Sequence, residues 1–414
     1  MPHVDNDSSG CLAGLHVAIV PSWWPSPESP VAGVFFQDYV RAFADAGAAV
    51  GVIYPDLVNL RLAVRRGALP VVTRVLHESV GGSPVVRLRG LSVAFRRPGV
   101  HMRRYLRRLR RGFAIYRERY GEPDILHAMC AIPAGWACTR LDGGWSRRVV
   151  VTEHTGPFSL ALIPQCAGDF TRAALADAAA VVAVGAALRD EMTAAGISRE
   201  INVIGNPVGN EFVPAPPPAA ESDLKGRPKY RGLFVGRLSA LKGIPELTAA
   251  ASTLASDPGF SIEWHVAGTG ELESGLRKIL DVVGLDVPAV MHGHCGRSEI
   301  ADLLRCSHFL VLPSHGENCP LSVCEALATG RPVVGTRVPG IAALVGRTDG
   351  VLCDVGDAGA LAAAIRRLVL DYERYDWQAI SSRARASFDG MAVAAAYSKV
   401  FTQVVQGSPV KNLV

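Results

Sequence analysis

Two segments in the second half of the chain carry residues that could hold a phosphate-bearing, polyhydroxylated ligand. In the first, an apolar run ends at Gly236 and delivers Arg237 and Lys242 into the following loop. Arginine presents a fork of fixed donors, whereas lysine is a mobile point charge. Together the two cations could neutralise a diphosphate leaving group without a metal, which is the chemistry of a transferase.

The second segment is PSHGENCPLSVCEALATGRPVV, residues 313–334. It predicts a loop carrying Glu317, after a buried strand at 309–312, and a helix with Pro320 in its first turn, where the missing N–H of proline costs nothing. Glu325 follows on that helix. A helix start offers donors and partial positive charge to anions, and carboxylates accept hydrogen bonds from sugar hydroxyls. We expect both segments to serve one ligand.

These segments resemble the retaining glycosyltransferases of family four, which have the GT-B fold. The matching stretches are GRLSALKG, the 313–334 segment, PSWWPSPESPVAGVFFQDYVRAFADAG, VVVTEHTG, VVAVGAALRDEM and VIGNPV, so the resemblance covers nearly the whole chain. By this resemblance Arg237 and Lys242 bind the nucleotide diphosphate. Glu317 would contact the donor sugar, and Glu325 the ribose.

The resemblance also implies the rest of the site. His154, in VVVTEHTG, would contact the transition state or a hydroxyl of the reacting sugar. The backbone after Glu317 would hold the sugar and phosphate, and Gly293 would line the base pocket. The implied catalytic residues are His154, Arg237, Lys242 and Glu317, and the implied donor-binding residues are Gly33, Gly236, Gly293, Asn318, Cys319, Pro320, Leu321, Ser322 and Glu325. We expect no metal and no cofactor other than the donor substrate.

A few positions depart from the family's pattern. Ala32 precedes Gly33 where a Gly-Gly pair is common, and Asn318-Cys319 stands where glycine with an aromatic or apolar residue is frequent. Met129 occupies a position often held by a second histidine. The donor sugar and the acceptor are therefore not predicted. Cys319 lies near a helix start that could lower its pKa, but a small apolar filler is the simpler interpretation.

Length and composition indicate a two-domain globular α/β protein. The chain has 414 residues, 49% hydrophobic and 20% charged, which suits two domains of about 200 residues each. Nine cysteines form no C-x-x-C pair, so neither a metal site nor a disulfide framework is expected. The acidic, polar start lacks the pattern of a signal peptide. We expect a cytoplasmic protein, with peripheral association at the inner face of the membrane as an open alternative.

Short β-prone runs alternate with helical patterns along the chain, which is typical of parallel sheets covered on both faces. We predict two Rossmann-like domains facing across a cleft, with ligand at the carboxyl ends of the strands. By the resemblance, the first, acceptor-binding domain comprises residues 1–205 plus a returning helix within 390–414. The second comprises 206–389, which begins with a Pro-rich linker and continues as the donor-binding domain.

The strongest charge feature is the segment 95–120, which holds ten arginines against Glu118 alone. Its apolar residues follow helical spacing, so it predicts a basic amphipathic helix. Such a helix could dock on an anionic membrane surface through Arg96–Arg119, bind nucleic acid, or cover a core as a solvated face. Lipid-linked acceptors of similar enzymes favour the membrane, and no nucleic-acid-binding motif is present.

The predicted function is retaining transfer of a sugar, of hexosyl type, from a nucleotide-diphosphate donor to a hydroxyl of a glycan or lipid-linked acceptor in cell-surface polysaccharide or glycolipid biosynthesis. A non-hydrolysing sugar-nucleotide epimerase shares the GT-B fold but needs no acceptor. A non-catalytic sugar-nucleotide-binding protein would show no turnover. A glycoside hydrolase also uses paired carboxylates, but it has no need of the Arg237 and Lys242 cations.

Overall fold

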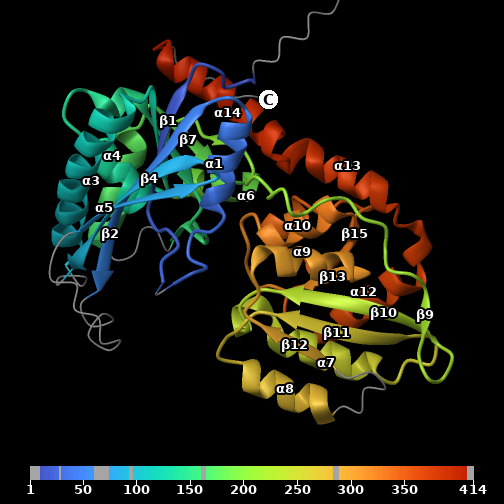
Figure 1. Cartoon of the computed structure of the whole chain (residues 1–414). Coiled ribbons are helices and arrows are strands. Elements are labelled where there is room, and N and C mark those ends of the chain that lie inside the picture. Colours follow the sequence, from blue (N-terminus) through green and yellow to red (C-terminus); the bar gives the residue numbers. More distant parts are fainter. Residues whose placement is uncertain are drawn as a thin grey trace, which may run out of the picture. The chain divides into compact units, whose positions relative to one another are not determined.

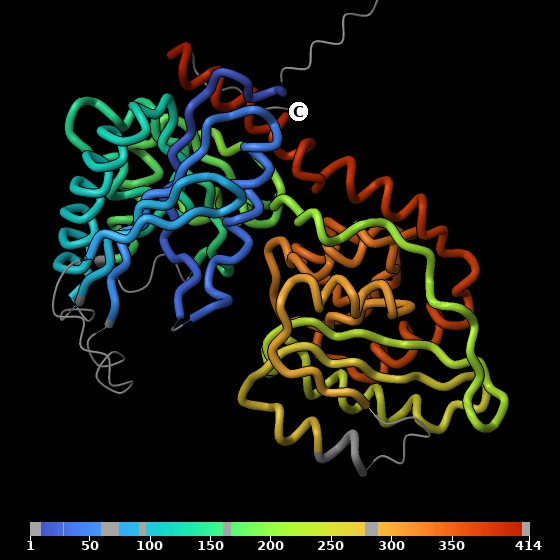
Figure 2. Tube along the Cα trace, viewed as in Figure 1, coloured from blue at the N-terminus to red at the C-terminus, as the bar shows by residue number. Residues whose placement is uncertain are grey.

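The computed structural model describes residues 10–27, 29–59, 74–92, 97–159, 165–282 and 289–407. The chain divides into two compact units, Met1–Pro207 with Gly390–Val414, and Val208–Asp389 (Figures 1 and 2). Each unit has a largely parallel sheet with helices around it. Two Rossmann-like α/β units are confirmed. Arg96 of the basic segment lies outside the described residues.

The sheet of the first unit has the strand order β3-β4-β2-β1-β5-β6-β7-β8. The strands are β1 (His16–Pro21), β2 (Ala49–Asn59), β3 (Arg74–Val80), β4 (Ser83–Ser92), β5 (Ile125–Met129), β6 (Val149–Glu153), β7 (Ala180–Ala183) and β8 (Asn202–Val203). The central strands β5, β6 and β7 are buried along their whole length, as expected of a parallel sheet covered on both faces. The sequence did not predict β3, which pairs antiparallel with β4 at the sheet edge.

The helices of the first unit are α1 (Phe36–Asp45), α3 (Pro98–Tyr120), α4 (Trp136–Cys138), α5 (Gln165–Asp177), α6 (Ala186–Ala194) and α14 (Gly390–Val405), with shorter turns at η1 (Ala131–Gly135) and η2 (Trp145–Arg148). The last helix, α14, packs on α1. Tyr397 and Phe401 of α14 contact the ring of Phe43 edge to face, with centroids 5.3 and 5.5 Å away. The carboxyl-terminal helix therefore completes the core of the first unit.

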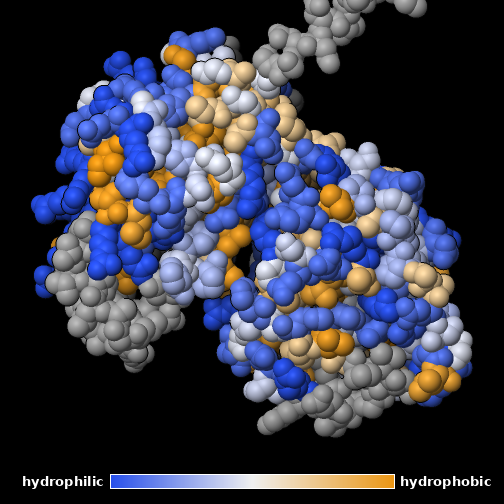
Figure 3. Space-filling model, in the orientation of Figure 1, coloured by the Kyte–Doolittle hydropathy of each residue, from blue (hydrophilic) through white to orange (hydrophobic). Residues whose placement is uncertain are grey.

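The basic helix α3 uses its apolar stripe to cover β2 and β4. Met102, Leu109 and Phe113 on this stripe are buried, so they belong to the core of the first unit. Several arginines face solvent, and Figure 3 shows hydrophilic side chains along the edge of this unit where α3 lies. Contact of α3 with a membrane would therefore depend on arginine charge. Among the described residues, every helix is too short or too polar to cross a bilayer.

The sheet of the second unit has the order β12-β11-β10-β13-β14-β15, with β9 antiparallel to β10. The strands are β9 (Glu221–Ser222), β10 (Pro228–Val235), β11 (Ser261–Ala267), β12 (Val290–Gly293), β13 (Phe309–Leu312), β14 (Val333–Thr336) and β15 (Gly350–Cys353). The helices are α7 (Ile244–Leu254), α8 (Glu273–Val282), α9 (Arg297–Arg305), α10 (Leu321–Thr329), α11 (Pro339–Ala342), α12 (Ala358–Leu370) and α13 (Trp377–Phe388), with 3₁₀ turns η4 (Ala240–Lys242) and η5 (Tyr372–Arg374).

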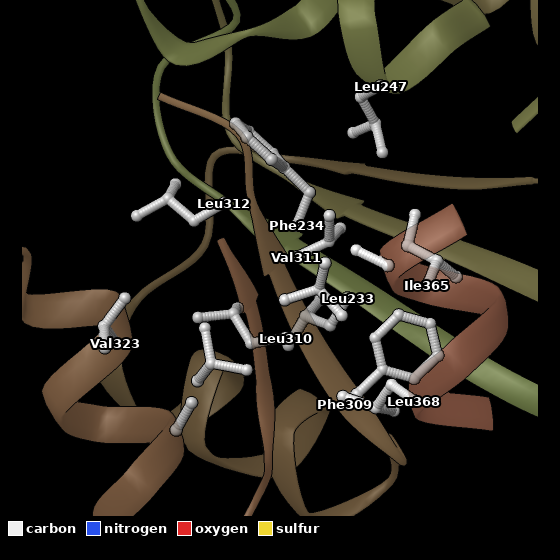
Figure 4. Packing of buried hydrophobic residues seen from close by; sticks show 14 of the residues in the cluster. Leu233, Phe234, Leu247, Phe309, Leu310, Val311, Leu312, Val323, Ile365 and Leu368 are labelled. Atoms are coloured by element: carbon white, nitrogen blue, oxygen red, sulfur yellow. The ribbon is translucent and has the colours of Figure 1, made fainter. Parts of the chain in front are cut away.

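The core of the second unit is centred on β10 and β13, which are adjacent and parallel (Figure 4). Leu233 of β10 pairs in register with Leu310 of β13, and both side chains are buried. Burying each such side chain contributes about 1.5–3 kcal/mol. This packing fixes the carboxyl ends of the two strands side by side, so the loops that begin at Gly236 and Pro313 start from neighbouring points.

Candidate active site

The structure brings Lys242 and Glu317 together. The Nζ atom of Lys242, in η4, contacts Oε1 of Glu317, in the loop after β13. The hydroxyl of Ser314 donates a hydrogen bond to the same carboxylate oxygen over 2.7 Å. Gly243 makes this approach possible: its φ of +71° favours glycine, and a Cβ there would overlap the carbonyl oxygen of Pro313. The Lys242 loop and the Glu317 loop thus form one assembly.

Arg237 lies at the carboxyl end of β10 and extends into solvent. Its side chain is 74% exposed and forms a long ion pair of 3.4 Å with Oε2 of Glu271. An exposed ion pair of this kind contributes roughly 0–1 kcal/mol. Arg237 can therefore exchange Glu271 for a more highly charged anion at little cost.

Gly236 and Gly293, two of the implied donor-binding glycines, are joined through a third glycine. The N–H of Gly268, after β11, donates to the carbonyl of Gly293 over 2.7 Å. A Cβ on Gly268 would overlap the carbonyl oxygen of Gly236. Gly236 and Gly293 are therefore held close together at the carboxyl ends of β10 and β12, and the backbone here has no side chain that would keep a ligand away.

Glu325 lies on α10, as predicted, but the helix begins one residue later than expected. Leu321 is its first residue, and Pro320 stands before it with extended backbone angles. Proline therefore serves as the flanking residue, and the first N–H groups of the helix belong to Leu321 and Ser322. The side chain of Glu325 is only 7% exposed, and its Oε1 lies 3.6 Å from a guanidinium nitrogen of Arg297. This cation offsets part of the cost of burying a carboxylate.

Asn318 and Cys319 lie between Glu317 and the start of α10. The side-chain amide nitrogen of Asn318 is buried and has no hydrogen-bond partner within the described part of the chain. Gly340 packs against this loop, because a Cβ there would overlap the backbone of Glu317 and Asn318. The Sγ atom of Cys319 lies 3.9 Å from that of Cys324. The hydrogen bond with Cys319, together with burial, raises the pKa of the Cys324 thiol well above its usual value.

In the first unit, Glu153 and His154 follow one another at the end of β6. The buried carboxylate of Glu153 accepts hydrogen bonds from the N–H groups of His154 and Thr155 over 2.9 and 2.8 Å through one oxygen. It accepts another from the N–H of Ala131 over 2.9 Å through the other. Glu153 thus fixes the backbone that presents His154, a role that the sequence did not predict.

The His154 ring lies among aromatic rings of the segment around α1. Its centroid is 5.2 Å from that of Phe36 and 5.9 Å from that of Tyr39, and a Cβ on Gly33 would press on the Phe36 ring. The predicted residues Gly33 and His154 therefore share Phe36 as a neighbour. Burial lowers the pKa of His154 to about 3, against the opposing effect of Asn206. The ring is neutral at physiological pH, and its Nε2 atom lacks a partner among the described residues.

His127 belongs to the core of the first unit. Its Nε2 atom lies 2.7 Å from the Thr152 hydroxyl, which in turn lies 2.8 Å from the Tyr397 hydroxyl of α14. Burial, with a smaller contribution from nearby His154, lowers the pKa of His127 to about 3. This series of hydrogen bonds through His127, Thr152 and Tyr397 joins β5, β6 and α14.

Sequence reasoning did not assign a role to several residues that support the predicted ones. Ser314 lies within the 313–334 segment, but nothing in the local sequence marks its hydroxyl as a partner of Glu317. Arg297 and Asn206 are distant in sequence from Glu325 and His154, and no local pattern joins them. The position of Gly340 shortly after a predicted strand is a local signal, but the sequence does not show that Gly340 packs against Glu317 and Asn318. Within the described ranges, no three His, Cys, Asp or Glu side chains are grouped as metal ligands.

Comparison with known proteins identifies the class. Residues 32–212 match the family described as Glycosyltransferase Family 4, and residues 229–371 match Glycosyl transferases group 1. The chain belongs to the family 4 glycosyltransferases, and it is an enzyme of the glycosyltransferase class. The resemblance found in the sequence is thereby confirmed.

Individual relatives agree with this assignment. A Bacillus subtilis (strain 168) protein named as the teichuronic acid biosynthesis glycosyltransferase TuaC is 27% identical over 374 residues, covering 85% of this chain and 89% of its own. The structure is similar to sucrose-phosphate synthase from Thermosynechococcus elongatus, with a TM-score of 0.71, 19% identity and coverage of 95% of this chain and 100% of that one. It is also similar to Anabaena HepE in complex with UDP, with a TM-score of 0.66, 17% identity and coverage of 94% and 100%. The fold is GT-B.

Proposed function

We propose that this enzyme is a retaining glycosyltransferase that moves a hexosyl group from a nucleoside-diphosphate sugar to a hydroxyl of a glycan or lipid-linked acceptor, in the synthesis of a cell-surface polysaccharide or glycolipid. The observation that carries the proposal is the assembly of Lys242 and Glu317 at the carboxyl ends of β10 and β13. The name of the Bacillus relative and the UDP bound to HepE are consistent with it.

In this proposal the second unit binds the donor. Cleavage of the bond between sugar and phosphate builds negative charge on the leaving diphosphate. Lys242, Arg237 and the N–H groups that open α10 would stabilise that charge where it develops. Glu317 would orient the sugar through its hydroxyls, and the buried carboxylate of Glu325 would accept hydrogen bonds from the ribose. No carboxylate is assigned as a nucleophile.

The first unit is assigned to the acceptor. His154 would contribute a neutral imidazole that can exchange hydrogen bonds with a sugar hydroxyl without adding a positive charge. The exposed arginines of α3 would hold the enzyme at an anionic membrane surface when the acceptor is lipid-linked. This association would be electrostatic, because the apolar stripe of α3 lies in the core.

The test is a thermal-shift screen of UDP, GDP, ADP and their sugar conjugates, carried out with EDTA present. Stabilisation by one nucleotide family would identify the base and support a diphosphate site that needs no added metal. Proton NMR of the reaction with a simple glycoside acceptor would then give the anomeric configuration of the product. Inversion of that configuration would contradict the retaining assignment, and the absence of any nucleotide shift would contradict the donor site.

A further inference from the structure

A polar pocket lies at the outer edge of the sheet in the second unit. Its volume is about 380 Å³, and it opens beside β15 and α12. Its polar lining comprises Arg337, Arg347, Arg367 and Tyr375, and none of the described residues that line it is acidic. A pocket with this excess of positive charge attracts anions.

The backbone of β15 adds hydrogen-bonding groups to the pocket. The carbonyl oxygens of Asp349 and Cys353 accept from the N–H groups of Val333 and Arg337 over 2.9 and 2.8 Å, so they face β14. Because successive residues of a strand direct their backbone groups to opposite sides, those of Gly350 and Leu352 face the other way. Both residues line the pocket, and β15 is the last strand in the sheet order.

The arginines of this pocket are weakly neutralised. Arg337 lies 3.6 Å from Asp354, and both side chains are largely exposed, at 62% and 80%. No carboxylate in the described part of the chain forms an ion pair with Arg347 or Arg367.

Two carboxylates close in sequence to residues that line the pocket have other partners. Asp349 pairs with Arg383 and accepts from the N–H of Gly346 over 3.1 Å. Asp371 pairs with Arg374 at 3.6 Å. The charges of Arg347 and Arg367 are therefore left for a bound anion.

We propose that this pocket binds a phosphate-bearing small molecule, with the guanidinium groups of Arg347 and Arg367 on the phosphate. Guanidinium forks match the geometry of phosphate oxygens and form charge-assisted hydrogen bonds with them. The pocket volume lies at the lower end of the range for small-molecule sites, which suits a sugar phosphate better than a polymer. The proposal is independent of the donor site, which uses none of these arginines.

A short segment of the chain also connects the pocket to the loop at residues 313–320, which carries Glu317 and is called the donor loop below. Arg337 is three residues from Gly340, whose backbone packs against Glu317 and Asn318. A ligand that fixes Arg337 would therefore restrain the segment on which the donor loop rests. Any effect of this ligand on donor binding must therefore be measured separately from its binding at the pocket.

The test is calorimetric titration of the full-length protein with glucose 6-phosphate, inorganic phosphate and glucose. Glucose 6-phosphate should bind saturably, about tenfold or more weakly to an R347Q/R367Q variant, and glucose should not bind. Arg366→Gln is the matched control, because Arg366 is next to Arg367 on α12 but pairs with Asp257 at 2.9 Å outside the pocket. Equal affinity for both phosphates would support recognition of the phosphate alone, and tighter binding of glucose 6-phosphate would support recognition of the sugar as well.

No saturable binding of either phosphate at millimolar concentration would overturn the proposal. Binding that is equally tight in the R347Q/R367Q variant would also overturn it, since the phosphate would then lie elsewhere. A second measurement locates the ligand by modifying arginines with phenylglyoxal and reading the sites by mass spectrometry. Glucose 6-phosphate should slow modification of Arg347 and Arg367 but not of Arg366, and equal rates with and without it would contradict the assignment.

Discussion

Lys242 and Glu317 are 75 residues apart in the chain, yet the Lys242 ammonium contacts the Glu317 carboxylate. The contact is partly buried, with the Glu317 side chain 10% exposed. The residue proposed to neutralise the diphosphate is therefore positioned by the residue proposed to orient the sugar. Removing either one leaves a charge in a partly buried site without its partner, so their contributions are coupled.

The first prediction concerns this coupling. Lys242→Ala should lower kcat for sugar transfer about a hundredfold, because a preorganised charge on the leaving group is lost. Glu317→Gln should also lower kcat, and the double variant should lose less than the product of the two single effects. Steady-state kinetics of the four proteins measure this. Arg277→Ala, an exposed substitution on α8, is the control. Wild-type kcat in both single variants, with folding intact, would contradict the site.

A different kinetic effect is expected at Glu325. Glu325→Gln should raise KM for the donor about tenfold or more and leave kcat nearly unchanged, since a charged hydrogen bond to the ribose contributes roughly 1.5–3 kcal/mol. Glutamine keeps the side-chain volume and leaves Arg297 an acceptor. Glu373→Gln, exposed in η5, is the control. A fall in kcat with an unchanged donor KM would assign Glu325 to a different role.

The donor loop should also be sensitive to a single methyl group. Gly340→Ala should lower activity at least tenfold, because the new Cβ would displace the backbone of Glu317 and Asn318. The matched control is Gly275→Ala in α8, where a Cβ meets nothing within 4 Å. That control should keep full activity and gain up to about 1 kcal/mol in stability. Transfer rates and urea unfolding distinguish the two variants, and equal activity would show that the contact with Gly340 is unimportant.

Buried histidines predict a loss of stability in acid. Burial lowers the pKa of His127 to about 3 in the folded protein, whereas it is about 6.5 in an unfolded chain. Between about pH 6.5 and 3 the unfolded state binds a proton that the folded state does not, so the free energy of unfolding falls as pH falls through this window. From pH 7.5 to 5 the loss is roughly 2 kcal/mol for this residue.

Urea unfolding at the two pH values measures that loss. His127→Gln should keep a hydrogen bond to Thr152 while removing the titrating group. The stability of this variant should therefore depend less on pH than that of the wild type. Some pH dependence should remain in the variant, because burial also lowers the pKa values of His154 and His308, to about 3 and about 4. Identical pH dependence in both proteins would show that His127 does not contribute.

The exposed face of α3 predicts binding to anionic vesicles. Arg103→Gln, Arg107→Gln and Arg111→Gln together should weaken sedimentation with vesicles that contain phosphatidylglycerol, by about 1 kcal/mol for each arginine removed. These three side chains face solvent, so the fold should be unaffected. The control is neutralisation of Arg277, Arg366 and Arg374 in the second unit. Binding that is insensitive to the α3 variant, or that is equal on phosphatidylcholine vesicles, would count against docking there.

The sequence by itself determined the elements and the identity of the family. Continuous apolar runs such as Phe309–Leu312 become strands buried on both faces, and the spacing of apolar residues in 35–46 becomes α1. These are local properties, because the period of burial is set by the element itself. The strand β3 was missed because it is polar and half exposed, although the Gly81-Gly82 turn after it, with both φ angles positive, is a hairpin signal.

The tertiary structure decided which residues meet. The pairing of Lys242 with Glu317, of Glu325 with Arg297 and of His154 with Asn206 depends on the order of strands in each sheet. No local period encodes that order, because it follows from how whole elements pack. The burial of the apolar stripe of α3 was undecided for the same reason: an amphipathic pattern shows that one face is covered, and only packing against β2 and β4 shows by what.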